Sequence, residues 1–236
     1  MFNGKRILAV VPARSGSKGI PGKNMKTLRG ITLIGWAGKT LARLPYIDAR
    51  IISTDSRQYA TEGKRYGLEA PFIRPRQLSH DRAGAVETLQ HALHASESYY
   101  GTQFDIILII EPTSPLRTPS DITMTVRRLI DSRADSAVSV SVLSKQSHPL
   151  KILKMDRRNR LGFFQKSGRR VHGRQSLKDD YYYRNGICYA LTRQCLVDRG
   201  AIFTKNTVAV VTPHPIANID DPLDLAWAAF LMNSKG

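Results

Sequence analysis

The chain contains 236 residues, of which 42% are apolar, and it carries a formal net charge of +17. This length and composition suit one α/β domain with a sizeable core and exclude a chain that is disordered by composition. The sequence has no run of about 18 apolar residues, so we expect no membrane span and a cytoplasmic protein. The charge predicts anionic partners, among them nucleotide phosphates, an acidic sugar and nucleic acid, without choosing between them.

Short apolar runs alternate with helical patterns along most of the chain, which predicts βαβ units and a mostly parallel sheet. The expected strands are residues 7–11, 49–54, 70–73, 104–110, 137–142, 186–191 and 208–211. The expected helices are residues 34–44, 56–66, 84–99, 120–132 and 221–232. Ser120 is expected as the N-cap of its helix, and Asp81 as the N-cap of the helix that begins near Gly84.

The alternating pattern stops between residues 144 and 183, where the chain is polar and basic. From Lys151 to Arg184 there are eleven Lys or Arg and three Asp, a net charge of +8. Long structureless loops are uncommon inside compact domains, so we expect residues 144–183 to form an inserted arm. Residues 1–143 and 184–236 would then form the α/β domain.

A glycine-rich, basic loop runs from Pro12 to Asn24, directly after the first expected strand. Its glycines, Gly16, Gly19 and Gly22, let the backbone turn tightly and bring N–H groups close to an anion. Its side chains add the cations Arg14, Lys18 and Lys23 and the hydroxyl groups of Ser15 and Ser17. The loop therefore has the position of a phosphate-binding loop, although its spacing matches neither the Walker A nor the dinucleotide motif.

A stiff turn, Glu111 to Arg117, follows the apolar run 104–110. It contains two prolines, and its arginine can meet an anion. The run before it is typical of a strand buried on both faces. Open α/β sheets bind their ligands at the carboxyl ends of such strands, so the turn is a second candidate for the site.

Asn218 and Asp220 alternate on an extended segment near the end of the chain. Residues separated by one position on such a segment point the same way, which suits a Mg²⁺ ion bridged to phosphate oxygens. Asp221 and Asp224 are expected in the first turn of the helix that follows, where carboxylates complement the helix dipole. The two cysteines, Cys188 and Cys195, lack a metal-ligand spacing and are expected to be ordinary buried thiols.

These motifs together resemble the acylneuraminate (CMP-sialic acid) cytidylyltransferases. The resemblance includes the loop Pro12 to Asn24, Ser53-Thr54-Asp55, Arg74-Pro75, the turn Glu111 to Arg117, Ser147 to Lys151, Arg174-Gln175, Tyr183 to Tyr189 and Asn218 to Leu225. It implies a Rossmann-like three-layer α/β sandwich whose arm takes part in a homodimer. It also implies an enzyme that joins CTP to a nine-carbon acidic sugar in the presence of Mg²⁺ and releases pyrophosphate.

The resemblance further implies a role for each matched residue. The expected nucleotide-binding residues are Arg14, Ser15, Gly16, Ser17, Lys18, Lys23, Asn24 and Arg74. The expected sugar-binding residues are Glu111, Arg117, Lys151, Gln175, Asn185 and Tyr189. The expected catalytic residues are Arg14, Lys23 and Asp220, and the expected Mg²⁺ ligands are Asp220 and Asn218.

Two of these positions depart from the family pattern. Glu111 stands where the family has glutamine, and an ionised carboxylate only accepts hydrogen bonds and repels a sugar carboxylate. Glu111 therefore points to an acidic sugar other than N-acetylneuraminate or to a hydroxyl or amine nearby. Asn218 stands where the family has aspartate, and its amide oxygen would bring less charge to a metal.

Two other functions remain open at the level of the sequence. A 3-deoxy-octulosonate cytidylyltransferase is disfavoured because its loop carries Ser-Thr-Arg-x-Pro, whereas this chain has Ser17-Lys18-Gly19-Ile20-Pro21. A basic nucleic-acid-binding protein would use the segment Lys151 to Arg184, where Phe163 and Phe164 could stack on bases. No recognised RNA- or DNA-binding module accompanies these residues.

Overall fold

The computed structural model describes residues 1–236 except 18, 171–172, 174, 176, 178 and 235–236. The chain divides into two compact units. The first consists of Met1–Ser139 and Asn185–Gly236, and the second of Val140–Arg184. One expected nucleotide-binding residue, Lys18, lies outside the described residues.

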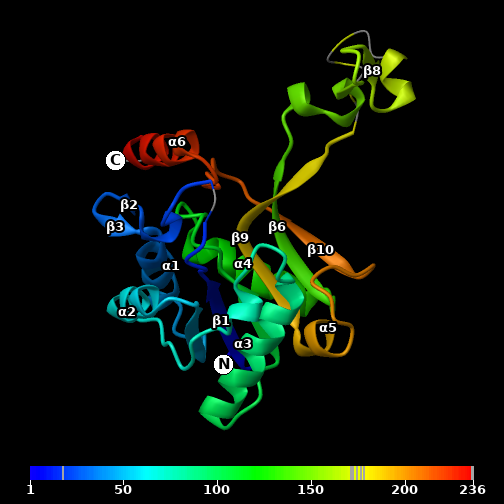
Figure 1. Ribbon diagram of the computed structural model, residues 1–236. Coiled ribbons are helices and arrows are strands. Elements are labelled where there is room, and N and C mark those ends of the chain that lie inside the picture. Colours follow the sequence, from blue (N-terminus) through cyan, green and yellow to red (C-terminus); the bar gives the residue numbers. More distant parts are fainter. Residues whose placement is uncertain (18, 171–172, 174, 176, 178, 235–236) are drawn as a thin grey trace. The chain divides into compact units, whose positions relative to one another are not determined.

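A mixed sheet of six strands, in the order β10-β6-β9-β5-β1-β4, forms the centre of the fold (Figure 1). β1 (Ile7–Pro12) runs parallel to both of its neighbours, β4 (Ala49–Ser53) and β5 (Ile106–Ile109). β9 (Tyr182–Thr192) runs antiparallel to β5. The other two strands are β6 (Ser136–Val142) and β10 (Thr207–Val211). The carboxyl ends of β1, β4 and β5 therefore meet at one edge of the sheet.

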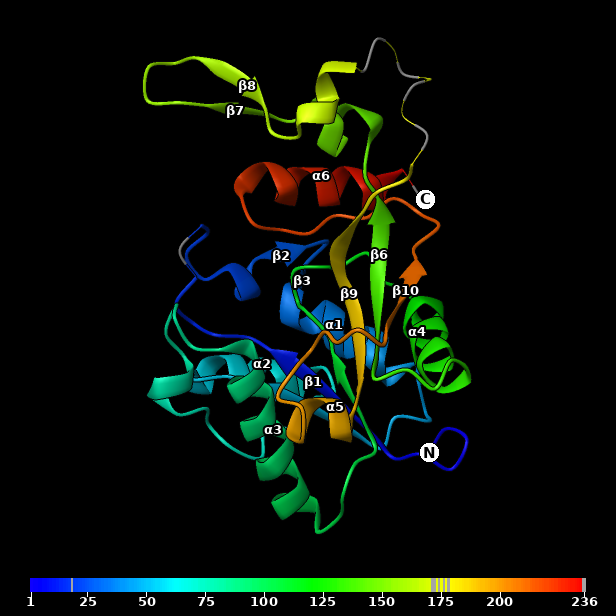
Figure 2. The same ribbon diagram turned by 90° about the vertical axis from the view of Figure 1, so that its right-hand side faces the viewer.

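Helices lie on both faces of this sheet (Figures 1 and 2), which gives the expected three-layer α/β arrangement. They are α1 (Leu33–Ala42), α2 (Arg57–Arg65), α3 (Ala85–Tyr100), α4 (Pro119–Asp131), α5 (Arg193–Val197) and α6 (Pro222–Asn233). Alternate residues of β1, such as Ile7 and Val11, join one core cluster with residues of α1, α2 and α4. The intervening residues Leu8 and Val10 are also fully buried, so β1 is covered on both faces.

The helix starts follow local capping chemistry, and here two expectations were wrong. α4 begins at Pro119 with Thr118 as its N-cap, because Thr118 and Asp121 form a reciprocal capping box; Ser120 is inside the helix. α3 begins after Gly84, which caps it without a side chain, and Asp81 has a different partner, described below. The expectation for Asp224 is confirmed, since it forms a capping box with Asp221 at the start of α6.

The expected strand 70–73 is also wrong. The chain there makes one isolated bridge, between Glu69 and Ile51, and does not continue along β4. Pro71 follows within two residues of that bridge, and proline has no N–H group to donate to a sheet. The other expected strands are present, with ends displaced by a few residues.

Short hairpins complete the two units. In the first unit, β2 (Thr27–Leu28) pairs with β3 (Ile31–Thr32). In the second unit, β7 (Leu153–Met155) pairs with β8 (Leu161–Phe163) in antiparallel fashion. None of the helices in the described part of the chain has both the length and the apolar character that crossing a membrane requires.

Candidate active site

A cavity of about 650 Å³ lies where the carboxyl ends of β1 and β5 meet the glycine-rich loop. Open α/β sheets bind ligands at this edge, so the cavity has the position of an active site. Its walls are formed by Pro12, Arg14, Ser17, Gly19, Lys23, Asn24, Arg74, Glu111, Pro112, Thr113, Asn218 and Asp220. Eight of the predicted site residues are therefore in one place: Arg14, Ser17, Lys23, Asn24, Arg74, Glu111, Asn218 and Asp220.

A hydrogen bond joins the start of the glycine-rich loop to its end. Near the start, the carbonyl oxygen of Arg14 accepts a hydrogen bond of 3.2 Å from Nδ2 of the buried Asn24. Gly22 adopts the left-handed conformation, with φ of +64°, and a short turn over Lys23–Met25 follows it. This conformation turns the chain so that Lys23 faces the cavity, and it favours glycine because other residues are strained there.

The loop also touches the segment that carries the predicted metal ligands. Nζ of Lys23 lies 2.8 Å from Oδ1 of Asp220. A Cβ atom on Gly19 would lie 2.5 Å from the carbonyl oxygen of Asp220, so only glycine fits at this contact. The two segments are far apart in the sequence, and both line the cavity.

Asn218 and Asp220 project alike because Ile219 between them is buried and its N–H donates to the carbonyl oxygen of Thr113, at 2.9 Å. Oδ1 of Asn218 is buried and accepts no hydrogen bond from any residue that the structure describes. The described residues contain no cluster of three His, Cys, Asp or Glu that could hold a metal unaided. One carboxylate and one amide oxygen suit Mg²⁺, which is commonly held by few protein ligands together with substrate phosphates.

A half-buried carboxylate, Asp55, holds the glycine-rich loop from the side of β4. Its Oδ1 accepts the N–H of Ser15 at 2.8 Å, and its Oδ2 accepts the Ser15 hydroxyl at 2.7 Å. Burial acts to raise the pKa of Asp55, but these hydrogen bonds and the nearby Arg74 outweigh it, so that the pKa lies below its ordinary value. The carboxylate is therefore ionised at neutral pH.

Arg74 lies near Asp55, since its backbone N–H donates to the carbonyl oxygen of Thr54 at 2.8 Å, and it is 5% exposed. Its Nε donates to Oγ of Ser53 at 3.1 Å, and its Nη2 donates to the Ser53 carbonyl oxygen. Burial lowers the pKa of the guanidinium, and the charge of Asp55 opposes that change. A buried cation thus reaches the cavity with its position set by the end of β4.

Arg14, the other cation at this end of the cavity, lies 2.6 Å from a carboxylate oxygen of Asp81. Asp81 was expected to cap α3, and its side chain is instead directed to the loop. The sequence contains no local signal for this pairing, because 67 positions separate the two residues. Asp55 had a weak signal, since it directly follows a strand that ends at the edge of the site.

The turn Glu111 to Arg117 is held by its own arginine. Nε of Arg117 donates to the carbonyl oxygen of Ile187 at 2.8 Å, and Nη2 donates to the carbonyl oxygens of Gly186 and Glu111. The side chain is buried, and this burial lowers the pKa of Arg117 to about 10. In this structure Arg117 therefore links the turn to β9 and does not line the cavity.

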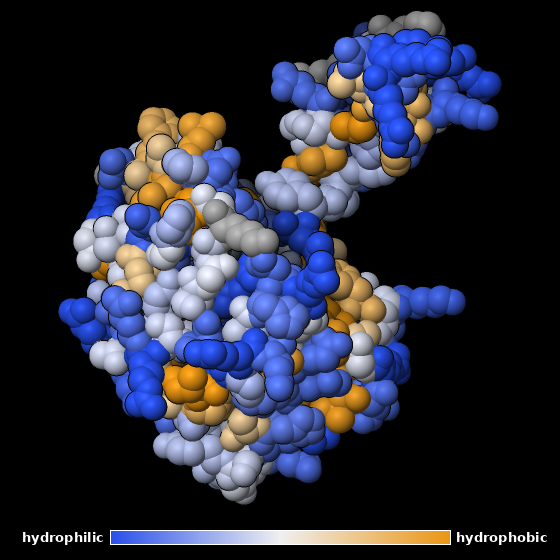
Figure 3. Space-filling view, in the orientation of Figure 1, coloured by the Kyte–Doolittle hydropathy of each residue, from blue (hydrophilic) through white to orange (hydrophobic). Residues whose placement is uncertain are grey.

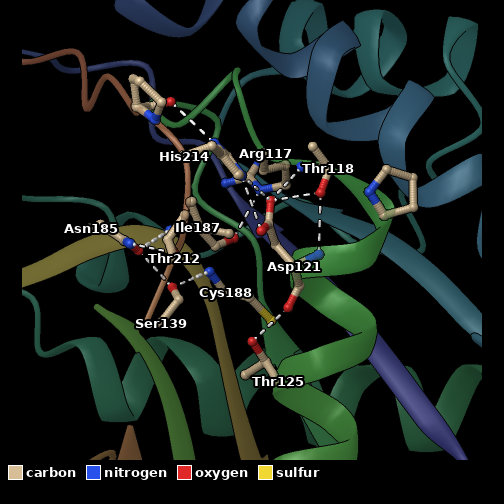
Figure 4. A network of polar contacts seen from close by, with 12 residues as sticks. Arg117, Thr118, Asp121, Thr125, Ser139, Asn185, Ile187, Cys188, Thr212 and His214 are labelled. Carbon is tan, nitrogen blue, oxygen red and sulfur yellow. Dashed lines mark hydrogen bonds and ion pairs between the residues drawn. The ribbon is translucent and has the colours of Figure 1, made fainter. Parts of the chain in front are cut away.

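A polar network surrounds this link (Figure 4). Asn185 is fully buried; its Oδ1 accepts from Oγ of Ser139 at 2.7 Å, and its Nδ2 donates to Oγ1 of Thr212 at 2.8 Å. On the other side, Nε2 of His214 lies 3.0 Å from Oδ2 of Asp121 at the start of α4. The network joins β9, α4 and the segment after β10, and Arg117 connects it to Glu111 in the cavity wall.

Arg117, Asn185 and Tyr189, which were expected to contact a sugar, are all buried and none of them lines the cavity. Two further sugar-binding candidates, Lys151 and Gln175, are exposed and belong to the second unit. The predicted sugar contacts of these five residues stay predictions. Glu111 is the one sugar-binding candidate that lines the cavity in the described part of the chain.

The remaining residues singled out in the sequence lie outside the cavity lining. Ser15 and Gly16 are exposed on the loop, outside the cavity lining. The two cysteines, Cys188 and Cys195, are both buried and free, as expected. Burial raises the pKa of the Cys188 thiol to about 12, which makes it a poor nucleophile at neutral pH.

A second cavity, of about 460 Å³, lies where β5 begins and β9 ends, at the opposite edge of the sheet. Four of the charged side chains in its wall are paired with opposite charges: Lys5 with Asp105, Arg193 with Glu97, and Asp135 with Arg199. The first cavity combines the glycine-rich loop, several cations and an unsatisfied buried acceptor. These features make it the better candidate for catalysis.

The comparisons with known proteins bear on the family of the chain. The cytidylyltransferase family model matches residues 8–211. The chain is 29% identical over 229 residues to the CMP-N,N'-diacetyllegionaminic acid synthase of Legionella pneumophila, and the match covers 94% of each chain. It is 28% identical over 232 residues to the N-acylneuraminate cytidylyltransferase of Escherichia coli, with 98% of this chain and 53% of that protein covered.

Among solved structures, a CMP:2-keto-3-deoxy-manno-octonic acid synthetase complexed with CTP has a similar fold. The TM-score is 0.70 at 19% sequence identity, and the match covers 98% of this chain and 100% of that chain. At this identity the similarity shows the fold alone. The family model, in contrast, covers most of the chain, including the loop, the turn and β9, and we conclude that the chain belongs to the cytidylyltransferase family.

Proposed function

We propose that this chain joins CTP to a nine-carbon acidic sugar and releases pyrophosphate. The observation that carries the proposal is the cavity, which is lined by Arg14 and Lys23 of the glycine-rich loop and by Arg74, in a chain of the cytidylyltransferase family. The names of relatives support the sugar, since they include synthases of CMP-N,N'-diacetyllegionaminic acid and cytidylyltransferases of N-acylneuraminate and pseudaminic acid.

In this reaction the anomeric hydroxyl oxygen of the sugar forms a bond to the α-phosphorus of CTP. The bond from that phosphorus to the bridging oxygen breaks, pyrophosphate leaves with the electron pair, and the hydroxyl proton passes to the surrounding water. The protein contributes position and charge. Arg14 and Lys23 would hold the triphosphate together with the N–H groups of the loop, and the guanidinium of Arg74 would contact the nucleotide.

Asp220 and Asn218 are the residues that would hold Mg²⁺. When bound, the ion would neutralise phosphate charge and polarise the α-phosphate. The unsatisfied Oδ1 of Asn218 and the carboxylate of Asp220 fit this role, because both line the same cavity wall. The ammonium group of Lys23 lies beside Asp220 and would add positive charge for the same phosphates.

We further propose that the enzyme is a homodimer, since it has two exposed apolar surfaces of the kind that mark contacts between proteins. On the β7–β8 hairpin, Leu153 pairs with Phe163 and Met155 with Leu161, which places all four side chains on one face, each 41–65% exposed. On α6, Leu223, Trp227 and Phe230 lie at helical spacing and are exposed, with the last two rings stacked at 5.4 Å. Figure 3 shows this patch of apolar side chains over α6.

The test of the reaction is pyrophosphate release in the presence of Mg²⁺, with each of the four nucleoside triphosphates and a panel of nine-carbon acidic sugars and 3-deoxy-octulosonate. We expect turnover with CTP and one nine-carbon sugar, and loss of that turnover in excess EDTA. Turnover with the eight-carbon sugar alone, or no turnover with any pair, would contradict the proposal.

The oligomeric state is tested by light scattering coupled to size-exclusion chromatography. We expect twice the chain mass of 26.4 kDa. A monomer at the concentrations used in the assay would contradict the homodimer and leave the proposed reaction unaffected.

A further inference from the structure

We propose that Asp55 is a positioning residue for the nucleotide: its carboxylate fixes the glycine-rich loop through Ser15 and places a negative charge beside the buried guanidinium of Arg74. The inference rests on the proposed function in one respect, that the loop holds CTP. It assigns to Asp55 a role in nucleotide binding and none in sugar binding.

The first observation is where Asp55 stands. β1 and β4 are parallel neighbours, with Pro12 opposite Ser53, and the N–H of Ala13 donates to the carbonyl oxygen of Ser53 at 3.0 Å. The loop therefore leaves the sheet directly beside the end of β4. Asp55, two residues beyond that end, is at the level of the first turn of the loop.

The second observation is the pair of hydrogen bonds to Ser15. One carboxylate oxygen takes the peptide N–H and the other takes the hydroxyl, at 2.8 and 2.7 Å. The carbonyl oxygen of Ser15 is also engaged, by the N–H of Ser17 at 3.0 Å. Both sides of this residue are thus fixed, although it is exposed and is followed by a glycine. The direction of the next N–H groups depends on this anchor.

The third observation concerns charge. Arg14 and Arg74 both line the cavity. The positive charge of Arg14 destabilises the charged form of Arg74, whereas the negative charge of Asp55 stabilises it. A carboxylate next to a triphosphate site would by itself repel the ligand. Here both of its oxygens are directed to Ser15, and Asp55 is outside the cavity lining. Its charge therefore acts on the protein cations and on the loop.

Three variants separate these effects. Asp55→Ala removes both hydrogen bonds and the charge. Asp55→Asn removes the charge alone, because the amide oxygen can accept the Ser15 N–H and the amide nitrogen can donate to its hydroxyl oxygen. The matched control is Asp48→Ala. The carboxylate of Asp48 also accepts a backbone N–H, from Ile7 at 2.8 Å, but it does so at the start of β1, far from the site.

The experiment is calorimetric titration of CTP into each full-length protein, followed by steady-state kinetics with both substrates. We expect Asp55→Ala to raise the Kd and the KM for CTP by about tenfold or more. This factor corresponds to the loss of hydrogen bonds to a charged group. Asp55→Asn should raise both by a smaller factor. The KM for the sugar should stay within twofold, and Asp48→Ala should bind CTP like the wild type.

The outcomes are distinguishable. If the wild type binds CTP and both Asp55 variants bind it equally well, the inference is overturned and the proposed function stands. If Asp48→Ala weakens CTP binding as much as Asp55→Ala, the effect is general instability and the inference is again overturned. If Asp55→Ala does not fold, the Asp55→Asn result decides. A wild-type protein that binds no CTP overturns the proposed function and this inference together.

Discussion

Lys23 and Asp220 are 197 positions apart in the sequence, and their charged atoms lie 2.8 Å apart in the wall of the cavity. The two side chains differ in environment, since that of Lys23 is 17% exposed and that of Asp220 is 72% exposed. The lysine is therefore held in place by the protein, whereas the carboxylate remains accessible to solvent. This relationship connects the glycine-rich loop to the segment that supplies the predicted metal ligands.

We expect Lys23→Ala and Asp220→Ala each to lower kcat by about two orders of magnitude, because both remove charge that stabilises the transferring phosphate. The fold should survive, since the ion pair is partly exposed and such pairs contribute little to stability. Circular dichroism and pyrophosphate release measure the two quantities. Lys26→Ala, an exposed lysine after the same turn, is the control and should retain activity. Near-full activity in either variant would exclude its assigned role.

Gly19→Ala should displace the loop from the Asn218–Asp220 segment. The new Cβ atom would lie 2.5 Å from the carbonyl oxygen of Asp220, and a backbone atom cannot move aside as a side chain can. We expect a destabilisation of about 1–3 kcal/mol and a higher KM for CTP. Urea denaturation and kinetics measure these effects. Gly162→Ala, where a Cβ meets no atom within 4 Å, is the matched control. An unchanged KM would show that the contact is unimportant for binding.

Arg117→Lys should lower the free energy of unfolding by about 2 kcal/mol or more, although it conserves the charge. Two guanidinium nitrogens serve three backbone carbonyls, whereas a lysine presents a single nitrogen and leaves buried acceptors unsatisfied. Urea denaturation measures the change, with the exposed Arg128→Lys on α4 as the control. Equal stability of the two variants would contradict the structural role of Arg117.

The stability conferred by Asp55 should depend on pH. The pKa of Asp55 is lower in the folded protein than in the unfolded chain, where it is about 3.9. Its carboxylate therefore stabilises the fold fully above that value, and the contribution is lost as the pH falls through the folded pKa. We expect the stability difference between wild type and Asp55→Asn to be constant from pH 6 to 8 and to shrink in acid, as measured by urea denaturation at each pH. A difference that grows on acidification would contradict the direction of the shift.

Much of the fold follows from local patterns in the chain. The run 104–110 predicted a strand because its mostly apolar residues suit a sheet covered on both faces. The prediction of a strand at 70–73 was wrong because Pro71 has no N–H group to donate to a sheet, although its neighbours are apolar. The antiparallel direction of β9 has no local signal, since the orientation of a strand is decided by the connection that precedes it.

The sequence by itself determined the loop Pro12 to Asn24, the turn Glu111 to Arg117 and the alternation of Asn218 and Asp220, because each is a short motif at a strand end. Only the tertiary structure decided which side chains face the cavity. Arg117 and Asn185 are buried in the structure, and Asp55 and Asp81 form hydrogen bonds with the loop. The physical reason is that these contacts join residues tens of positions apart, so that they depend on how the sheet and helices pack and not on any local pattern.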